Sequence, residues 1–245
     1  MKKLIMANWK MQLTIKESLE LARQFSKKIK PLKSEVVICP DYCALPFVGP
    51  VLKSSKLSLG AQDSAAFFKG AYTGEVSPVN LKTLGVKYVI IGHSERREHL
   101  HENSAIINNK IKVALENRLI PVLCVGEKLS ERNAGRTKDY LKMELSHALK
   151  GVKINSNNDL VVAYEPVWAI STNKNAKPIM PEEAKEIQKF IREQAYKILK
   201  KQVRVIYGGS ADSRNAQFFL NQDYIDGLLV GGASIKISEF PKMIK

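Results

Sequence analysis

Residues 88–117 read YVIIGHSERREHLHENSAIINNKIKVALEN, and this stretch contains the unit from which the whole chain is built. Its first four residues, Tyr88–Ile91, are apolar and mostly β-branched, which is typical of a parallel strand buried on both faces. A turn of glycine and polar residues follows. Asn103–Asn117 then spaces its apolar residues as a helix does. The stretch therefore predicts one strand, one turn and one helix.

The same unit recurs on either side. Seven more apolar runs cover Leu4–Ala7, Val36–Cys39, Leu57–Ala61, Pro121–Val125, Leu160–Tyr164, Val203–Tyr207 and Gly227–Val230. Between them, helical spacing is clearest in Lys16–Ile29 and Glu182–Leu199; Pro181 suits the first helical position, and Ser77-Pro78 opens a shorter helix. Eight alternations without a linker predict an α/β fold with one domain over residues 1–245. A closed (β/α)8 barrel is favoured over an open doubly wound sheet.

Composition limits the kind of protein. The 39 Lys+Arg and 24 Asp+Glu give a formal net charge of +15, with every quarter of the chain basic. No basic block is interleaved with aromatic residues, so a solvated surface is favoured over nucleic-acid binding. No run approaches the roughly 20 apolar residues of a membrane span, and Leu4–Ala7 is too short for a secretory signal. Three cysteines in apolar surroundings, Cys39, Cys43 and Cys124, predict a reduced cytoplasmic protein without disulfides.

Reactive side chains follow several of the apolar runs, at the end of a barrel where active sites lie. The side chains are those of Asn8, Lys10, His93 and Glu165, and two glycine turns, Gly208-Gly209-Ser210 and Gly231-Gly232, follow the last two runs. Singly, each has an ordinary structural interpretation, but those interpretations do not explain the shared position. Paired glycines let backbone N–H groups approach a phosphate, and Ser210 can add a donor. The set fits proton abstraction beside a carbonyl, with a base, an electrophile and a cation. No His/Cys set completes a metal site.

These residues and their neighbours resemble the triosephosphate isomerase family over essentially the whole chain. The resemblance is carried by Asn8–Met11, Ala71–Ser77, Gly92–Arg97, Cys124–Glu127, Ala163–Ile170, Tyr207–Ser210, Asp226-Gly227 and Val230–Ser234. It implies a TIM barrel that interconverts dihydroxyacetone phosphate and D-glyceraldehyde 3-phosphate in glycolysis and gluconeogenesis. It also implies that the reaction needs neither a cofactor nor a metal.

The resemblance further implies a role for each matching residue. Glu165 matches the base, His93 the neutral electrophile, and Lys10 the cation that binds substrate beside Asn8. The residues that match the phosphate grip are Ser171, Ser210, Gly231 and Gly232. Those that match positions supporting the reactive groups are Ser94, Glu95 and Cys124.

A homodimer is also implied. Residues Gln62–Ser77 match a long loop that enters the partner, and Thr73 matches its tip, which braces the neighbour's Asn8–Lys10 region. The apolar residues in Ala65–Tyr72 agree, because a monomer would expose them, and such patches mark interfaces.

The sequence departs from the family after Trp168. Ser171 and Asn173 replace the usual glycines, the segment through Pro178 is about three residues longer than usual, and Met180 stands where a Ser or Thr cap is typical. These changes are expected to alter loop kinetics. Two alternatives remain open: a catalytically reduced barrel that serves as a binding protein, and another sugar-phosphate enzyme of this fold, such as an aldolase.

Overall fold

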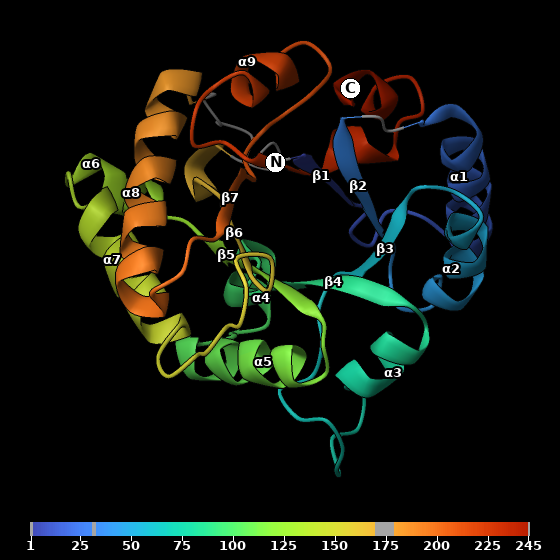
Figure 1. Ribbon diagram of the computed structural model, residues 1–245, viewed down its shortest axis with the longest axis horizontal. Coiled ribbons are helices and arrows are strands. Elements are labelled where there is room, and N and C mark those ends of the chain that lie inside the picture. Colours follow the sequence, from blue (N-terminus) through green and yellow to red (C-terminus); the bar gives the residue numbers. More distant parts are fainter. Residues whose placement is uncertain (1, 31–32, 170–178, 245) are drawn as a thin grey trace.

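A computed structural model describes residues 2–30, 33–169 and 179–244, and it places a ring of parallel strands inside a layer of helices (Figure 1). The strands are β1 Lys3–Asn8, β2 Ser34–Cys39, β3 Ser58–Ala61, β4 Val86–Ile91, β5 Ile120–Val125, β6 Val161–Tyr164, β7 Arg204–Tyr207 and β8 Gly227–Val230. Each strand pairs with the next, and β1 pairs with β8, so the sheet closes on itself. The predicted closed (β/α)8 barrel is confirmed, and the open sheet is excluded.

The strands are buried on both faces, as their apolar runs indicated. In β1, Leu4 and Met6 pack in the interior of the barrel, whereas Ile5 and Ala7 pack between the barrel and the helices. Both faces therefore require apolar side chains, and the alternation typical of a half-exposed strand is lost. All eight predicted runs match strands, with ends that differ by two residues at most.

The helices fill the connections. They are α1 Ile15–Lys28, α2 Leu45–Lys53, α3 Pro78–Thr83, α4 Ser94–His99, α5 Ser104–Glu116, α6 Leu129–Asn133, α7 Thr137–Ala148, α8 Pro181–Leu199 and α9 Ala216–Leu220. In the part of the chain that the structure describes, three short 3₁₀ segments are η1 Val167–Ala169, η2 Gly232–Ile235 and η3 Phe240–Met243. The predicted helices after β1, before β5 and before β7 are confirmed, as is the short one that opens at Ser77-Pro78.

Local sequence explains where several helices begin. Thr14 and Glu17 form a reciprocal capping box at the start of α1. The Ser77 hydroxyl accepts a hydrogen bond from the Val79 N–H at the start of α3. In contrast, Met180 precedes α8 without a side-chain cap, as the sequence indicated, and Pro181 occupies the first turn. The other departures, at Ser171, Asn173 and Pro178, lie outside the described residues.

A network of charged side chains, of which Arg204 is buried and Glu35 half-buried, lies at the end of the barrel where the strands begin. The Tyr88 hydroxyl donates to Glu35 Oε1 over 2.8 Å, and Arg204 Nη1 donates to Glu35 Oε2 over 2.9 Å. Lys87 Nζ donates to the same carboxylate over 2.6 Å. This network ties β2, β4 and β7 together at that end, so the opposite end is left for the reactive residues.

The connection between β3 and α3 projects from the body of the molecule (Figure 1). Phe67, Phe68 and Tyr72 are 44%, 51% and 43% exposed on it, and Thr73 next to them is also exposed. The Phe67 and Tyr72 rings stack with centroids 4.2 Å apart. The predicted apolar exposure is therefore confirmed for Phe67, Phe68, Ala71 and Tyr72, but it is wrong for Ala65, which is buried.

The three cysteines were all predicted to lie in apolar surroundings. Cys39 and Cys124 are buried, but Cys43 is exposed, so the prediction of apolar surroundings for all three is wrong at Cys43. That residue lies in the turn between β2 and α2, and such connecting segments run over the surface.

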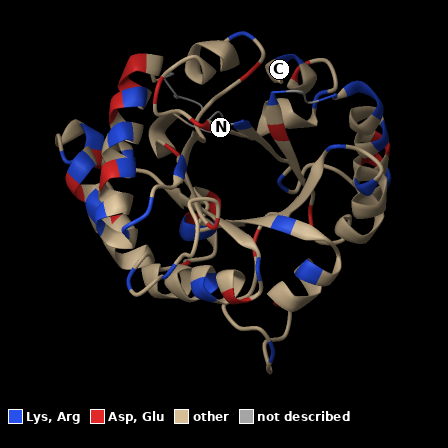
Figure 2. Ribbon diagram, viewed as in Figure 1, with Lys and Arg blue, Asp and Glu red and all other residues tan. Residues whose placement is uncertain are grey.

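Figure 2 shows Lys and Arg on the outer helices with Asp and Glu among them. Within the described ranges, no helix combines the length and the apolar character that crossing a membrane requires.

Candidate active site

His93 and Glu165 meet at the carboxyl ends of the strands. His93 precedes α4 and Glu165 directly follows β6, and His93 Nε2 lies 3.2 Å from Glu165 Oε1. The two residues are only 7% and 2% exposed. His93 Nδ1 accepts a hydrogen bond from the Glu95 N–H over 3.3 Å. Because an accepting nitrogen carries no proton, the neutral ring holds its proton on Nε2, facing the Glu165 carboxylate.

The Glu165 carboxylate is held from several sides. The Ser94 N–H donates to its Oε2 over 3.2 Å, and the Glu165 N–H donates to the Val125 carbonyl over 2.8 Å. A Cβ at Gly208 would lie 2.8 Å from Glu165 Cγ, so only glycine leaves room for this side chain. Among the described residues, Glu165 Oε1 has no aligned hydrogen-bond donor, so it is available to a substrate.

Lys10 has a strained backbone conformation, and hydrogen bonds fix both its backbone N–H and its carbonyl. Its φ is 53°, in the left-handed region that costs a non-glycine residue about 1–3 kcal/mol. The Lys10 N–H donates to Asn8 Oδ1 over 3.1 Å, and Gln62 Nε2 donates to the Lys10 carbonyl over 2.9 Å. Lys10 Nζ reaches Glu95 Oε1 at 2.5 Å. This conformation directs the ammonium group into the rim of the barrel, which is formed by the carboxyl ends of the strands and the residues that directly follow them.

One small pocket brings most of the predicted residues together. It is lined by Asn8, Lys10, His93, Glu165, Gly208, Gly209, Leu229 and Gly231. The lining comes from the carboxyl ends of β1, β4, β6, β7 and β8. Barrel closure therefore assembles an amine, an amide, an imidazole and a carboxylate around one space.

A second cavity, of about 580 Å³, lies beside the two glycine turns and is lined in part by Ser210, Gly231 and Gly232. A Cβ at Gly231 would lie 3.4 Å from Lys10 Cε, so this turn closely approaches the lysine. The Ser210 hydroxyl and N–H both donate to the Ala169 carbonyl, over 2.9 and 3.3 Å. Both donors of Ser210 are thus engaged in this state, and Ser171 lies outside the described residues.

Arg97, within the Gly92–Arg97 motif, has contacts that its sequence did not indicate. Arg97 Nε donates to the Gly92 carbonyl over 2.7 Å, and its Nη2 donates to the Cys124 carbonyl over 2.9 Å. Its Nη1 lies 3.1 Å from Glu144 Oε1, and Glu144 Oε2 accepts the Gly126 N–H over 2.9 Å. Arg97 therefore ties the ends of β4 and β5 together behind His93. Only its place in the same motif as His93, four residues further along, could have indicated this.

Gln62 and Glu127 also have contacts that sequence reasoning did not predict. Gln62, expected only as the start of the dimer loop, holds the Lys10 carbonyl within its own chain. Glu127 is fully buried and accepts the Trp168 Nε1–H over 2.7 Å and the Tyr164 hydroxyl over 3.2 Å. These bonds fix η1, which follows Glu165.

Cys124 lies in the barrel interior, where burial and then the negative charge of Glu165 raise the pKa of its thiol well above the ordinary value. The thiol is therefore neutral and acts as packing beneath the carboxylate.

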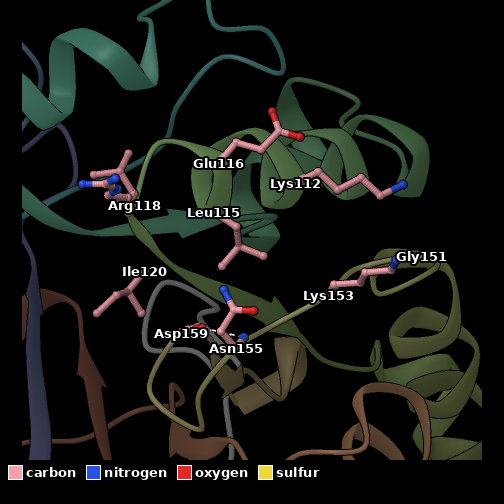
Figure 3. A pocket seen from close by; sticks show the side chains of 10 residues that line it. Lys112, Leu115, Glu116, Arg118, Ile120, Gly151, Lys153, Asn155 and Asp159 are labelled. Carbon is pink, nitrogen blue, oxygen red and sulfur yellow. Dashed lines mark hydrogen bonds between the residues drawn. The ribbon is translucent and has the colours of Figure 1, made fainter.

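Other parts of the described structure offer less. No group of three or more His, Cys, Asp or Glu residues within it is arranged to hold a metal ion. A pocket of about 570 Å³ lies between the end of α5 and the connection before β6 (Figure 3). Lys112 and Lys153 point to one side of it and Arg118 to the other. Glu116 and Asp159 also line it, and none of the rim residues does.

A closed parallel barrel with a buried carboxylate, an imidazole and a lysine at the carboxyl ends of its strands defines an acid–base enzyme of the (β/α)8 class. The family model for triosephosphate isomerase matches residues 3–245. The chain belongs to the triosephosphate isomerase family.

Relatives named triosephosphate isomerase cover nearly all of the chain. The protein from Caldanaerobacter subterraneus subsp. tengcongensis is 43% identical over 245 residues, which is 98% of each chain. The protein from Dictyoglomus turgidum is 42% identical over 249 residues, or 100% of this chain and 99% of the relative. The protein from Clostridium botulinum is 40% identical over 98% of each chain.

Proposed function

We propose that the chain, acting as one catalytic domain over residues 1–245 in the cytoplasm, interconverts dihydroxyacetone phosphate and D-glyceraldehyde 3-phosphate. Family membership supports the reaction and its place in glycolysis and gluconeogenesis. One observation carries the proposed mechanism. Glu165 Oε1 and His93 Nε2 lie 3.2 Å apart, and both residues are buried. A base and a hydrogen-bond donor that share one space can act on adjacent atoms of one substrate.

Glu165 removes a proton from the carbon beside the carbonyl. The electrons of that C–H bond form a carbon–carbon double bond, and the carbonyl oxygen takes the negative charge. His93 Nε2–H donates a hydrogen bond to this oxygen, while Lys10 and Asn8 lie on the same pocket wall. The hydroxyl proton passes between the two oxygens through His93, and Glu165 returns its proton to the neighbouring carbon. Protons move and no electrons are gained or lost overall.

The substrate phosphate is held beside Gly231 and Gly232, with Ser210 and the Ser171 N–H as further donors. The cavity next to these glycines supports this placement. Since the Ser210 donors are bonded to the Ala169 carbonyl, substrate must compete with that carbonyl for them.

The active form is a homodimer in which the Gln62–Ser77 loop enters the partner, with Thr73 at its tip. The exposed Phe67, Phe68 and Tyr72 support this assembly, since a monomer would leave them in water. Ala65 at the base of the loop is buried, so the aromatic tip is presented on a fixed base.

A coupled assay that follows D-glyceraldehyde 3-phosphate formation tests the reaction and the base together. Glu165→Asp keeps the acid but withdraws it by one methylene, and a misplacement of about 1 Å can cost about 10²-fold. We expect kcat to fall by at least about 10²-fold, with little change in competitive inhibition by inorganic phosphate. Near-normal turnover of the variant would remove Glu165 from its role, and wild-type protein without isomerase activity would favour the binding protein or the aldolase.

A further inference from the structure

The charges around the phosphate end of the site are mostly neutralised within the protein. The Lys10 ammonium is paired with Glu95 Oε1 at 2.5 Å. The Arg214 guanidinium reaches Asp212 Oδ2 through Nη2 at 2.5 Å and through Nε at 3.0 Å. Each pair has no net charge. A phosphate dianion that approaches the glycine turns therefore gains little attraction from the Arg214–Asp212 pair, whereas Lys10 lines the inner pocket around His93 and Glu165.

Lys236 is different from these two cations. It follows η2, which begins at Gly232, and it lines the same cavity as Ser210 and Gly232. It is exposed, and among the described residues no carboxylate pairs with its ammonium group. Glu239 lines the cavity as well and keeps its negative charge there, because its carboxylate accepts the Ser213 hydroxyl at 2.5 Å and the Ser213 N–H at 3.4 Å, and hydrogen bonds from Ser213 lower its pKa.

The Lys236 backbone is fixed while its side chain is unpaired. Its N–H donates to the Ala233 carbonyl over 3.3 Å, and its carbonyl accepts the Glu239 and Phe240 N–H groups, each over 3.0 Å. The position of Lys236 at the cavity is thus set by turns on both sides. A Cβ at Gly232 would meet nothing within 4 Å, so the backbone there is open to the cavity that Lys236 lines.

We propose that Lys236 captures the phosphate dianion of the substrate at the outer end of this cavity and so promotes its entry to the Gly231-Gly232 turn. An unpaired cation beside a cavity raises the local concentration of an anion and its rate of association. The inference rests on the proposed function, because that function supplies the dianion. It adds a residue that acts by attraction, outside the pocket where bonds break and form.

Lys236→Gln removes the charge, and Lys236→Arg retains it. Dissociation constants for inorganic phosphate, measured by titration calorimetry, should rise about fivefold in the glutamine variant and change little in the arginine variant. kcat/KM for D-glyceraldehyde 3-phosphate should fall about fivefold at low salt, and the difference should shrink at about 0.2 M salt. kcat should be unchanged, as should kcat/KM for phosphate-free D-glyceraldehyde.

Lys153→Gln is the matched control. It removes the same charge from another exposed lysine, in the pocket that contains none of the rim residues (Figure 3). Equal losses in Lys153→Gln and Lys236→Gln would overturn the proposal, because net charge alone would then explain them. An equal loss with phosphate-free D-glyceraldehyde, or unchanged phosphate affinity in Lys236→Gln, would also overturn it.

The binding and kinetic measurements separate this inference from the proposed function. Wild-type protein that binds phosphate through Lys236 yet does not isomerise triose phosphates would refute the function and support the phosphate site. Full isomerase activity with no effect of Lys236→Gln on phosphate affinity would support the function and refute the role of Lys236.

Discussion

Replacing Gly208 with alanine tests whether the rate depends on where the Glu165 carboxylate sits. The new Cβ would lie 2.8 Å from Glu165 Cγ and 3.3 Å from the Tyr164 carbonyl oxygen. That carbonyl accepts the Gly208 N–H over 2.8 Å, so it cannot yield easily, and the Glu165 side chain must. Ordinary carbon contacts begin at about 3.5 Å, so the side chain must move by about 0.7 Å. Since about 1 Å can cost about 10²-fold, we expect kcat to fall between about 10-fold and about 10²-fold.

The coupled isomerase assay measures this loss, and thermal unfolding checks that the variant is folded. Gly49→Ala is the control, because Gly49 lies in α2, away from the active site. Its new Cβ would meet mainly the flexible Leu59 side chain, with Cδ2 at 3.1 Å. The control should retain wild-type turnover. If Gly208→Ala also turned over within about twofold of wild type, the position of Glu165 would not limit the rate, and the reasoning would be refuted.

Two further predictions concern stability and assembly. Burial acts to raise the pKa of Glu35, but hydrogen bonds from Lys87, Arg204 and Tyr88 and the charge of Arg204 outweigh it and hold the pKa at about 2, below the ordinary 4.5. This carboxylate therefore stabilises the fold above pH 4.5, and the stabilisation is lost as the pH falls toward 2. Glu35→Gln should lower the free energy of unfolding by about 2 kcal/mol at neutral pH and by less in acid. Urea titrations at the two pH values would measure this difference. An equal loss at both pH values would contradict the ionic explanation. Deleting the tip of the Gln62–Ser77 loop around Thr73 should give monomers with reduced activity, which light scattering and the coupled assay would measure, and a wild-type monomer at micromolar concentration would contradict the dimer.

The sequence alone determined the barrel and the order of its elements. Strands such as β6, with all four residues buried, must be apolar throughout, so a single sequence shows them directly. Helix starts are local as well, which is why Pro181 and the uncapped Met180 could be predicted at α8. The rim residues Asn8, His93 and Glu165 could be selected because each follows a strand, and parallel strands in a barrel end on one side.

Only the tertiary structure decided which of these side chains touch. Gln62 holds the carbonyl of Lys10, 52 residues away, and Glu165, which follows β6, meets His93, which follows β4. Ser210, chosen as a phosphate donor, gives both its donors to Ala169. Periodicity records which face of a strand or helix is buried. The contacts depend on how far each strand is shifted against its neighbour when the sheet closes, and the packing of the whole barrel sets that shift.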